Sequence, residues 1–107
     1  MKKNKNLIIL IILFIIIDLL FVYENFIRVE GNITFELNGN EEINIYQDTP
    51  YNDDGYLLEN DFNKDLNKYV KTENNVDTKN IGTYEVIYNL KYKTKKLTLT
   101  RKVNVIH

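Results

Sequence analysis

The segment Gly-Thr-Tyr-Glu-Val-Ile-Tyr at residues 82–88 decides the fold of this chain. After its glycine, aromatic or apolar side chains recur at every second position, as Tyr84, Val86, Tyr88 and Leu90. The positions between them are polar except for Ile87. Alternation with a period of two residues is typical of a strand with one face in a core and the other in solvent. We therefore predict a half-buried antiparallel strand that begins at this segment.

Short alternating runs also occupy most of the chain after residue 32. They lie at residues 33–37, 43–45, 56–58, 66–71, around Val76, and at 82–92 and 97–105, separated by turns rich in Gly, Asn and Pro. About seven short antiparallel strands predict an all-β domain, an immunoglobulin-like β-sandwich, with an open barrel as the alternative. Tyr84 follows the loop that opens the central strand. This is the position of a tyrosine corner, in which the hydroxyl bonds back to upstream backbone.

The composition excludes several kinds of catalytic site. The chain of 107 residues is long enough for one ordinary domain, and it contains neither cysteine nor serine. Its only histidine is the terminal His107. Disulfides, thiolate metal sites, histidine clusters and Ser-His or Cys-His catalysis are therefore excluded. Paired carboxylates remain, but a small sandwich offers no deep pocket to raise one pKa, so we expect no enzyme.

The N-terminal part has the pattern of a membrane anchor. Residues 1–6 carry three lysines, and the run from Leu7 to Tyr23 is apolar except for Asp18. The apolar run predicts a transmembrane segment at 7–27, followed by a linker at 28–32. The lysines before it predict that residues 1–6 form a cytoplasmic tail, so the domain at 33–107 lies outside. The end of the apolar run, residues 19–27, has no small residues of the kind that signal peptidase needs, which favours an uncleaved signal-anchor over a cleaved signal peptide.

Asp18 is the one charged residue inside the apolar run from Leu7 to Tyr23. Such residues are costly in hydrocarbon and are often functional, so one interpretation is a contact with the helix of a partner membrane protein. The other is that the carboxyl group stays neutral or near water in the outer half of the bilayer.

The last strand has an apolar face that a charge interrupts. Its inward positions are Leu97, Leu99, Arg101, Val103 and Val105. Arg101 either reaches the edge of the sheet with its charged end or pairs with a carboxylate. We take Gly82, Tyr84, Tyr88 and Arg101 as the structural residues of the fold.

Several short motifs, in this order and spacing, resemble a bacterial immunoglobulin-like domain of unknown function, the kind found in cell-surface proteins and in a pesticidal crystal protein. The resemblance covers residues 33–106. The motifs are Tyr51, Asp53 and Gly55; Asn63-Lys64-Asp65-Leu66 followed by Val70; Val76-Asp77-Thr78; Gly82-Thr83-Tyr84 and Tyr88; and Arg101-Lys102-Val103-Asn104-Val105.

The resemblance implies a non-catalytic surface module, and the chain departs from the family pattern in two places. The family usually has Gly-Asp where this chain has Lys64-Asp65. It commonly ends the central strand in Asp, with Gly-Asn in the hairpin, where this chain has Tyr92 and Lys95-Lys96. The hairpin geometry and any acidic role for that corner are therefore open.

Charge is distributed unevenly along the exterior part. Residues 31–65 carry nine acidic side chains and one basic, whereas residues 66–107 carry three acidic and nine basic. Neutralisation across strands is the simplest interpretation. The alternative is a lysine-rich hairpin that binds an anionic wall polymer or membrane phosphates, with the ligand-binding residues Lys91, Tyr92, Lys93, Lys95 and Lys96. An exterior location argues against nucleic acid.

Calcium is the one cofactor that the sequence suggests. Asp61, Asn63 and Asp65 match the first three liganding positions of an EF-hand loop. The sixth position is Leu66 instead of Gly and the twelfth is Thr72 instead of Glu, so the segment is no EF-hand. A different oxygen-rich calcium site and a solvated acidic loop both remain open.

Two functions follow from these patterns. The first is a single-pass membrane protein whose exterior domain binds a surface protein or a cell-wall glycan. The second is an accessory subunit or spacer, docked on a larger membrane protein through the helix that carries Asp18. The abundance of Asn, Lys and Ile is typical of an AT-rich genome and suggests a low-GC, Gram-positive-type bacterium.

Overall fold

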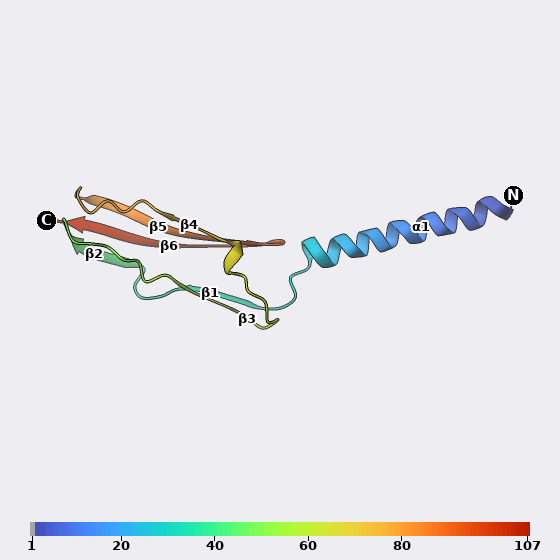
Figure 1. Ribbon diagram of the computed structural model, residues 1–107, viewed down its shortest axis with the longest axis horizontal. Helices are drawn as coiled ribbons and strands as arrows, with labels where there is room; N and C mark the ends of the chain where they lie inside the picture. Colours follow the sequence, from blue (N-terminus) through green and yellow to red (C-terminus); the bar gives the residue numbers. More distant parts are fainter. Residues whose placement is uncertain (1) are drawn as a thin grey trace.

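The computed structural model describes residues 2–107 and shows a long helix followed by two facing β-sheets (Figure 1). The elements are α1 (Lys2–Val22), the π-helical turn η1 (Tyr23–Ile27), β1 (Ile33–Leu37), β2 (Glu42–Tyr46), β3 (Tyr56–Asn60), the 3-10 turn η2 (Asn67–Tyr69), β4 (Val70–Asn74), β5 (Gly82–Tyr92) and β6 (Lys95–Ile106). Met1, the first residue of the predicted tail, lies outside the described residues, and α1 already begins at Lys2.

The helix projects away from the sheets and packs on none of them (Figure 1). Its span Asn4–Ile27 has a mean hydropathy of 2.9 and is long and apolar enough to cross a membrane. Every described side chain in this span is exposed, including Asp18. The predicted apolar helix is therefore present, and among residues 2–107 the sheets leave its side chains uncovered.

The sheets contain six strands, in the orders β1-β3 and β2-β6-β5-β4. Three details of the prediction were wrong. The strand expected at residues 66–71 is the turn η2 followed by β4. The segment around Val76 forms no strand, and β2 pairs with β6 in parallel, through Ile43 opposite Val103. The turn between β1 and β2 does not reverse the chain but moves it from one sheet to the other, so both strands run away from the helix (Figure 1).

The core lies between the two sheets and follows the predicted alternation. Its buried apolar residues are Phe35, Leu66, Val86, Tyr88, Leu90, Tyr92, Val103 and Val105. Ile87, the apolar exception, faces outward and is half-buried. The tyrosine corner is also present, because the Tyr84 hydroxyl donates a hydrogen bond to the Asn80 carbonyl at 2.7 Å.

An ion pair lies inside this core. Arg101 is completely buried, and its Nε lies 3.3 Å from Oδ1 of Asp53. Its Nη2 donates to the carbonyls of Asn38 and Gly55, the second at 3.2 Å. Arg101 thus pairs with a carboxylate, which the sequence left open. Its Nε and Nη1 have no hydrogen-bond partner within residues 2–107. Charge attraction to the Asp53 carboxylate is therefore a main part of what stabilises the buried guanidinium.

The Asp53 carboxylate accepts hydrogen bonds from three groups. The hydroxyls of Tyr51 and Tyr88 donate to its two oxygens, and the Gly55 amide donates at 2.9 Å. Burial alone would raise the pKa of Asp53, but these hydrogen bonds and the charge of Arg101 together hold it below the usual value. Burial, and then the bond to Asp53, raises the pKa of Tyr88 to about 12. The carboxylate is therefore ionised at neutral pH.

We expect Asp53→Ala to lower the free energy of unfolding by about 3–5 kcal/mol, because it leaves the Arg101 charge buried without a partner. The neighbouring Asp54 is exposed, and Asp54→Ala should change stability by no more than about 0.5 kcal/mol. Urea denaturation of the full chain in detergent, followed by the near-ultraviolet circular dichroism of its tyrosines, measures both. Equal stability of the two variants would show that the pair does not hold the core.

Candidate functional site

The predicted lysine site lies at the turn between β5 and β6, which is the end of the domain next to the helix (Figure 1). The structure divides its five residues. Tyr92 is buried in the core, and Lys93 occupies the turn with a φ of 51°. The remaining three, Lys91, Lys95 and Lys96, are exposed. The exposed lysines are free to meet an anionic ligand, whereas Tyr92 and Lys93 serve the junction with the helix.

Lys93 and Thr94 cap the C-terminal end of the helix. Lys93 Nζ donates to the carbonyls of Glu24 and Arg28, both at 2.8 Å, and Thr94 Oγ1 donates to the Ile27 carbonyl at 2.8 Å. The last carbonyls of a helix have no partners within it and carry partial negative charge, so a cation is favourable there. The hairpin turn of the domain thus ties the domain to the end of the helix.

Glu30 joins the same group from the connecting segment. Its carboxylate pairs with Lys93, accepts the Tyr92 hydroxyl at 2.6 and 2.8 Å, and lies 3.6 Å from Lys64 Nζ. The hydrogen bond from Lys93, and then that from Tyr92, lowers the pKa of Glu30 to about 2. We call Glu30, Lys64, Tyr92, Lys93 and Thr94 the junction cluster. The cluster holds residues 28–30 of the segment predicted as a linker, and Asp61 holds its other end by accepting the Asn32 amide.

The predicted calcium residues are engaged in local hydrogen bonds. Asp61 accepts from the Asn32 amide at 2.8 Å, and Asp65 accepts from the Asn67 amide at 3.0 Å. Asn63 has a positive φ of 52° and shapes the turn. Within residues 2–107, no three His, Cys, Asp or Glu side chains gather in a way that could hold a metal ion. Calcium binding stays a prediction without a preformed site.

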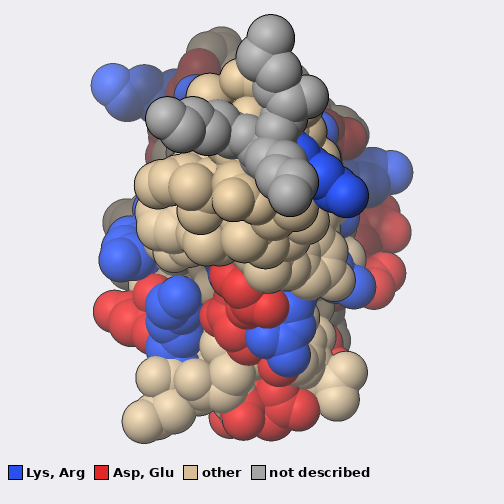
Figure 2. All heavy atoms as spheres, turned by 90° about the vertical axis from the view of Figure 1, so that its right-hand side faces the viewer, with Lys and Arg blue, Asp and Glu red and all other residues tan. Residues whose placement is uncertain are grey.

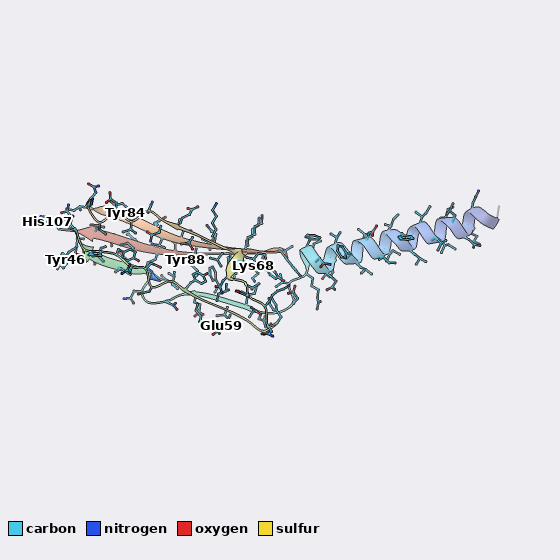
Figure 3. All side chains as sticks on the ribbon, viewed as in Figure 1. Tyr46, Glu59, Lys68, Tyr84, Tyr88 and His107 are labelled. Carbon is cyan, nitrogen blue, oxygen red and sulfur yellow. The ribbon has the colours of Figure 1, made fainter. Side chains whose placement is uncertain are left out.

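A second candidate surface lies at the opposite end of the domain and was missed from the sequence. Tyr46 of β2 pairs with Ile106 of β6, and the β5–β6 register, continued by one residue, places Ile81 beside Ile106. Tyr46 is 66% exposed, Ile106 is 37% exposed and Ile81 is 55% exposed. Figure 3 shows Tyr46 at the end remote from the helix. We call these three residues the distal strip. In the sequence, these three residues are apolar at outward positions. A strand pattern assigns such positions to solvent, so it does not mark them as a binding surface.

The junction should loosen in acid. A carboxylate whose folded pKa is lowered stabilises the structure fully above its ordinary pKa of 4.5, and this contribution is lost as the pH falls toward about 2. Spin labels at Leu20→Cys and Thr100→Cys, unique because the chain has no cysteine, report the distance between helix and domain by pulsed electron paramagnetic resonance. We expect a narrow distance distribution at pH 7 that broadens in acid.

In this experiment Glu30→Gln should give a broad distribution already at pH 7. Glu24→Gln is the matched control, because Glu24 is an exposed carboxylate of the same junction whose side chain pairs only with Arg28 among the described residues. A Glu30→Gln distribution as narrow as that of the unchanged chain would show that the junction cluster does not fix the domain.

Comparison with known proteins agrees with this fold. The model of the family described as bacterial surface protein, Ig-like domain, matches residues 35–105. Among solved structures, the crystal structure of the lipoprotein BT2262 from Bacteroides thetaiotaomicron superposes with a TM-score of 0.60 and 28% sequence identity. The match covers 69% of this chain and 37% of that one, so the chain spans well under half of the lipoprotein's length. No curated protein matches.

The family match takes in strands of both sheets, from the middle of β1 to the penultimate residue of β6. It includes the Asp53–Arg101 pair and the tyrosine corner, and it confirms the resemblance inferred from the motifs. The chain belongs to the family of bacterial surface proteins with an Ig-like domain.

Proposed function

We propose that this chain is a single-pass membrane protein whose Ig-like domain has a non-catalytic binding role on the cell surface. The observation that carries the proposal is the capped junction, in which Lys93 and Thr94 bind the end of an exposed apolar helix. The junction cluster fixes the direction of the domain relative to the helix. The distal strip then lies at the end of a molecule 84 Å long, remote from the anchor.

The dimensions of the helix support anchoring. The 24 residues from Asn4 to Ile27 measure about 36 Å at 1.5 Å per residue, enough to cross a hydrocarbon layer of about 30 Å. The lysines that precede the apolar run favour a cytoplasmic N-terminus, which puts the sheets outside.

The chemistry of the distal strip supports a protein ligand over a wall polymer. One aromatic and two aliphatic side chains lie in adjacent positions, and the row behind them is polar: Asn104 donates to Asn44 at 2.9 Å, and Thr83 donates to Asn104 at 3.0 Å. An apolar centre with a polar rim is the usual composition of a protein interface. The shifted pKa values of Asp53 and Glu30 are explained by structural pairs, which supports a role without catalysis.

A cysteine scan on intact cells tests this function. The variants Tyr46→Cys, Leu57→Cys and Lys5→Cys are treated with a membrane-impermeant maleimide that carries a photoreactive group. We expect labelling at positions 46 and 57 but not at position 5 until the cells are permeabilised. After illumination we expect a discrete protein adduct from position 46 only, because Leu57 is an exposed apolar residue outside the distal strip.

Each outcome has a distinct meaning. Labelling of position 5 alone would reverse the topology and remove the surface role. An adduct at position 46 that wall hydrolases shorten would identify a glycan as the ligand. Equal adducts at positions 46 and 57 would show that the distal strip has no special role in binding.

The second candidate function is an accessory subunit or spacer, and it is favoured by one observation. Asp18 lies in the apolar span and is exposed, and a carboxyl group in hydrocarbon is costly without a partner. If a larger membrane protein receives it, Asp18→Leu should abolish co-migration with that protein on native gels of gently solubilised membranes. If Asp18→Leu migrates as the unchanged chain does, whether in a complex or alone, the accessory function is contradicted. The binding module is then the function that remains.

A further inference from the structure

A cavity of about 270 Å³ lies where the domain meets the helix. Its lining comes from both parts of the molecule: Asn25, Phe26, Lys64, Tyr69, Tyr92 and Lys93. Two of these side chains are positively charged and three are aromatic, and none is acidic. The connecting segment supplies Glu30, which contacts Lys64, Tyr92 and Lys93 of this lining.

The position of the cavity follows from the length of the helix. If the span Asn4–Ile27 crosses a hydrocarbon layer of about 30 Å, its last turn emerges into the headgroup region, which brings the bilayer to about 40–45 Å. Phe26, which is 63% exposed, and Tyr23, which is 47% exposed, lie in this turn. Tyr and Trp side chains are enriched at that depth, which suits Tyr23. The cavity therefore opens among lipid headgroups.

The charges at the cavity leave a surplus of cations. Among the described residues, Glu30 is the one carboxylate that pairs with lysines lining the cavity, and Lys93 and Lys64 share it, the second at 3.6 Å. The other hydrogen bonds of Lys93 go to the carbonyls of Glu24 and Arg28. Lys64 also lies 3.1 Å from the Tyr92 hydroxyl, and its side chain is still 46% exposed. Lys68 Nζ lies over the Tyr69 ring, 5.3 Å from the centroid, and Figure 3 shows it in the part of the domain near the helix.

The surface around the end of the helix carries charges of both signs. Figure 2, which looks along the helix toward the domain, shows Lys and Arg side chains interspersed with Asp and Glu. A uniform basic surface would attract any anion without orienting it. Here the surplus charge of Lys64 and Lys68 stands beside an aromatic-lined cavity, which is the arrangement that an amphiphilic anion needs.

We propose that this junction cavity binds the headgroup of an anionic phospholipid of the outer leaflet. The ammonium groups of Lys64 and Lys68 bind the phosphate, and the rings of Tyr69 and Phe26 contact the glycerol and the first methylenes of the chains. The occupant is a lipid because Phe26 belongs to the helix that enters the bilayer, so acyl chains lie beside the cavity. This inference rests on the proposed membrane anchoring.

The test uses the purified full chain in nanodiscs of phosphatidylcholine with a minor fraction of phosphatidylglycerol. Spin-labelled phosphatidylglycerol and phosphatidylcholine report the relative affinity of each lipid for the protein. We expect a preference of at least about threefold for phosphatidylglycerol in the unchanged chain. In Lys64→Gln/Lys68→Gln the preference should fall to about one, and in Lys64→Arg/Lys68→Arg it should persist.

The matched control is Lys79→Gln/Lys102→Gln, which removes the same charge near the distal end, where both lysines are exposed. It should keep the preference. An equal loss in the control, or no preference in the unchanged chain, would overturn the proposal. Loss of the preference on adding millimolar inorganic phosphate would identify a phosphate site instead of a lipid site, which also overturns it.

The result separates this inference from the proposed function. A chain that enters the nanodiscs but shows no lipid preference retains its anchor and lacks only the headgroup site. A chain that stays outside the nanodiscs has no membrane anchor, and both proposals then fail.

Discussion

The ion pair between Arg101 and Asp53 is the contact on which the rest of the domain depends. It joins the last strand, β6, to the loop before β3, and through Tyr88 and the Asn38 carbonyl it also reaches β5 and the turn after β1. Each of these segments comes from a different part of the sequence. The apolar core alone gives a domain of this size without disulfides only marginal stability. The buried polar contacts that join distant segments of the chain are therefore important for the fold.

Burial explains why this pair is sensitive. Taking a guanidinium and a carboxylate out of water costs several kcal/mol for each, and only their mutual attraction and the surrounding donors offset that cost. Tyr51, Tyr88 and the Gly55 amide supply those donors to Asp53. The Glu30–Lys93 pair is different, because Glu30 is about one-quarter exposed and its partner also binds the helix carbonyls. The first pair determines the fold, and the second fixes how the fold meets the helix.

The sequence could predict those parts that depend on local pattern. The alternation through Val86 and Tyr88 predicted which face of β5 is buried, and the loop before Tyr84 predicted the tyrosine corner. The partner of Arg101 could not be chosen, since periodicity reports burial and not which of several carboxylates lies opposite. The parallel pairing of β2 was missed for a related reason: Ile43 and Ile45 show that a strand exists but not which sheet it joins. The roles of Lys93 and Ile81 depend on which ends of the elements meet in space, and no local pattern contains that information.

The placement of β6 also has a mechanical consequence. This strand runs along the domain from the helix junction to the distal end, flanked by β5 along its whole length and by β2 over its last part. A pull on the distal strip, opposed by a force on the helix at the other end of the molecule, acts parallel to the strands. The hydrogen bonds of the two ladders are then loaded together in shear instead of being opened one after another. The same geometry that sets the ends far apart therefore makes the domain a stiff connection between the helix and whatever the far end holds.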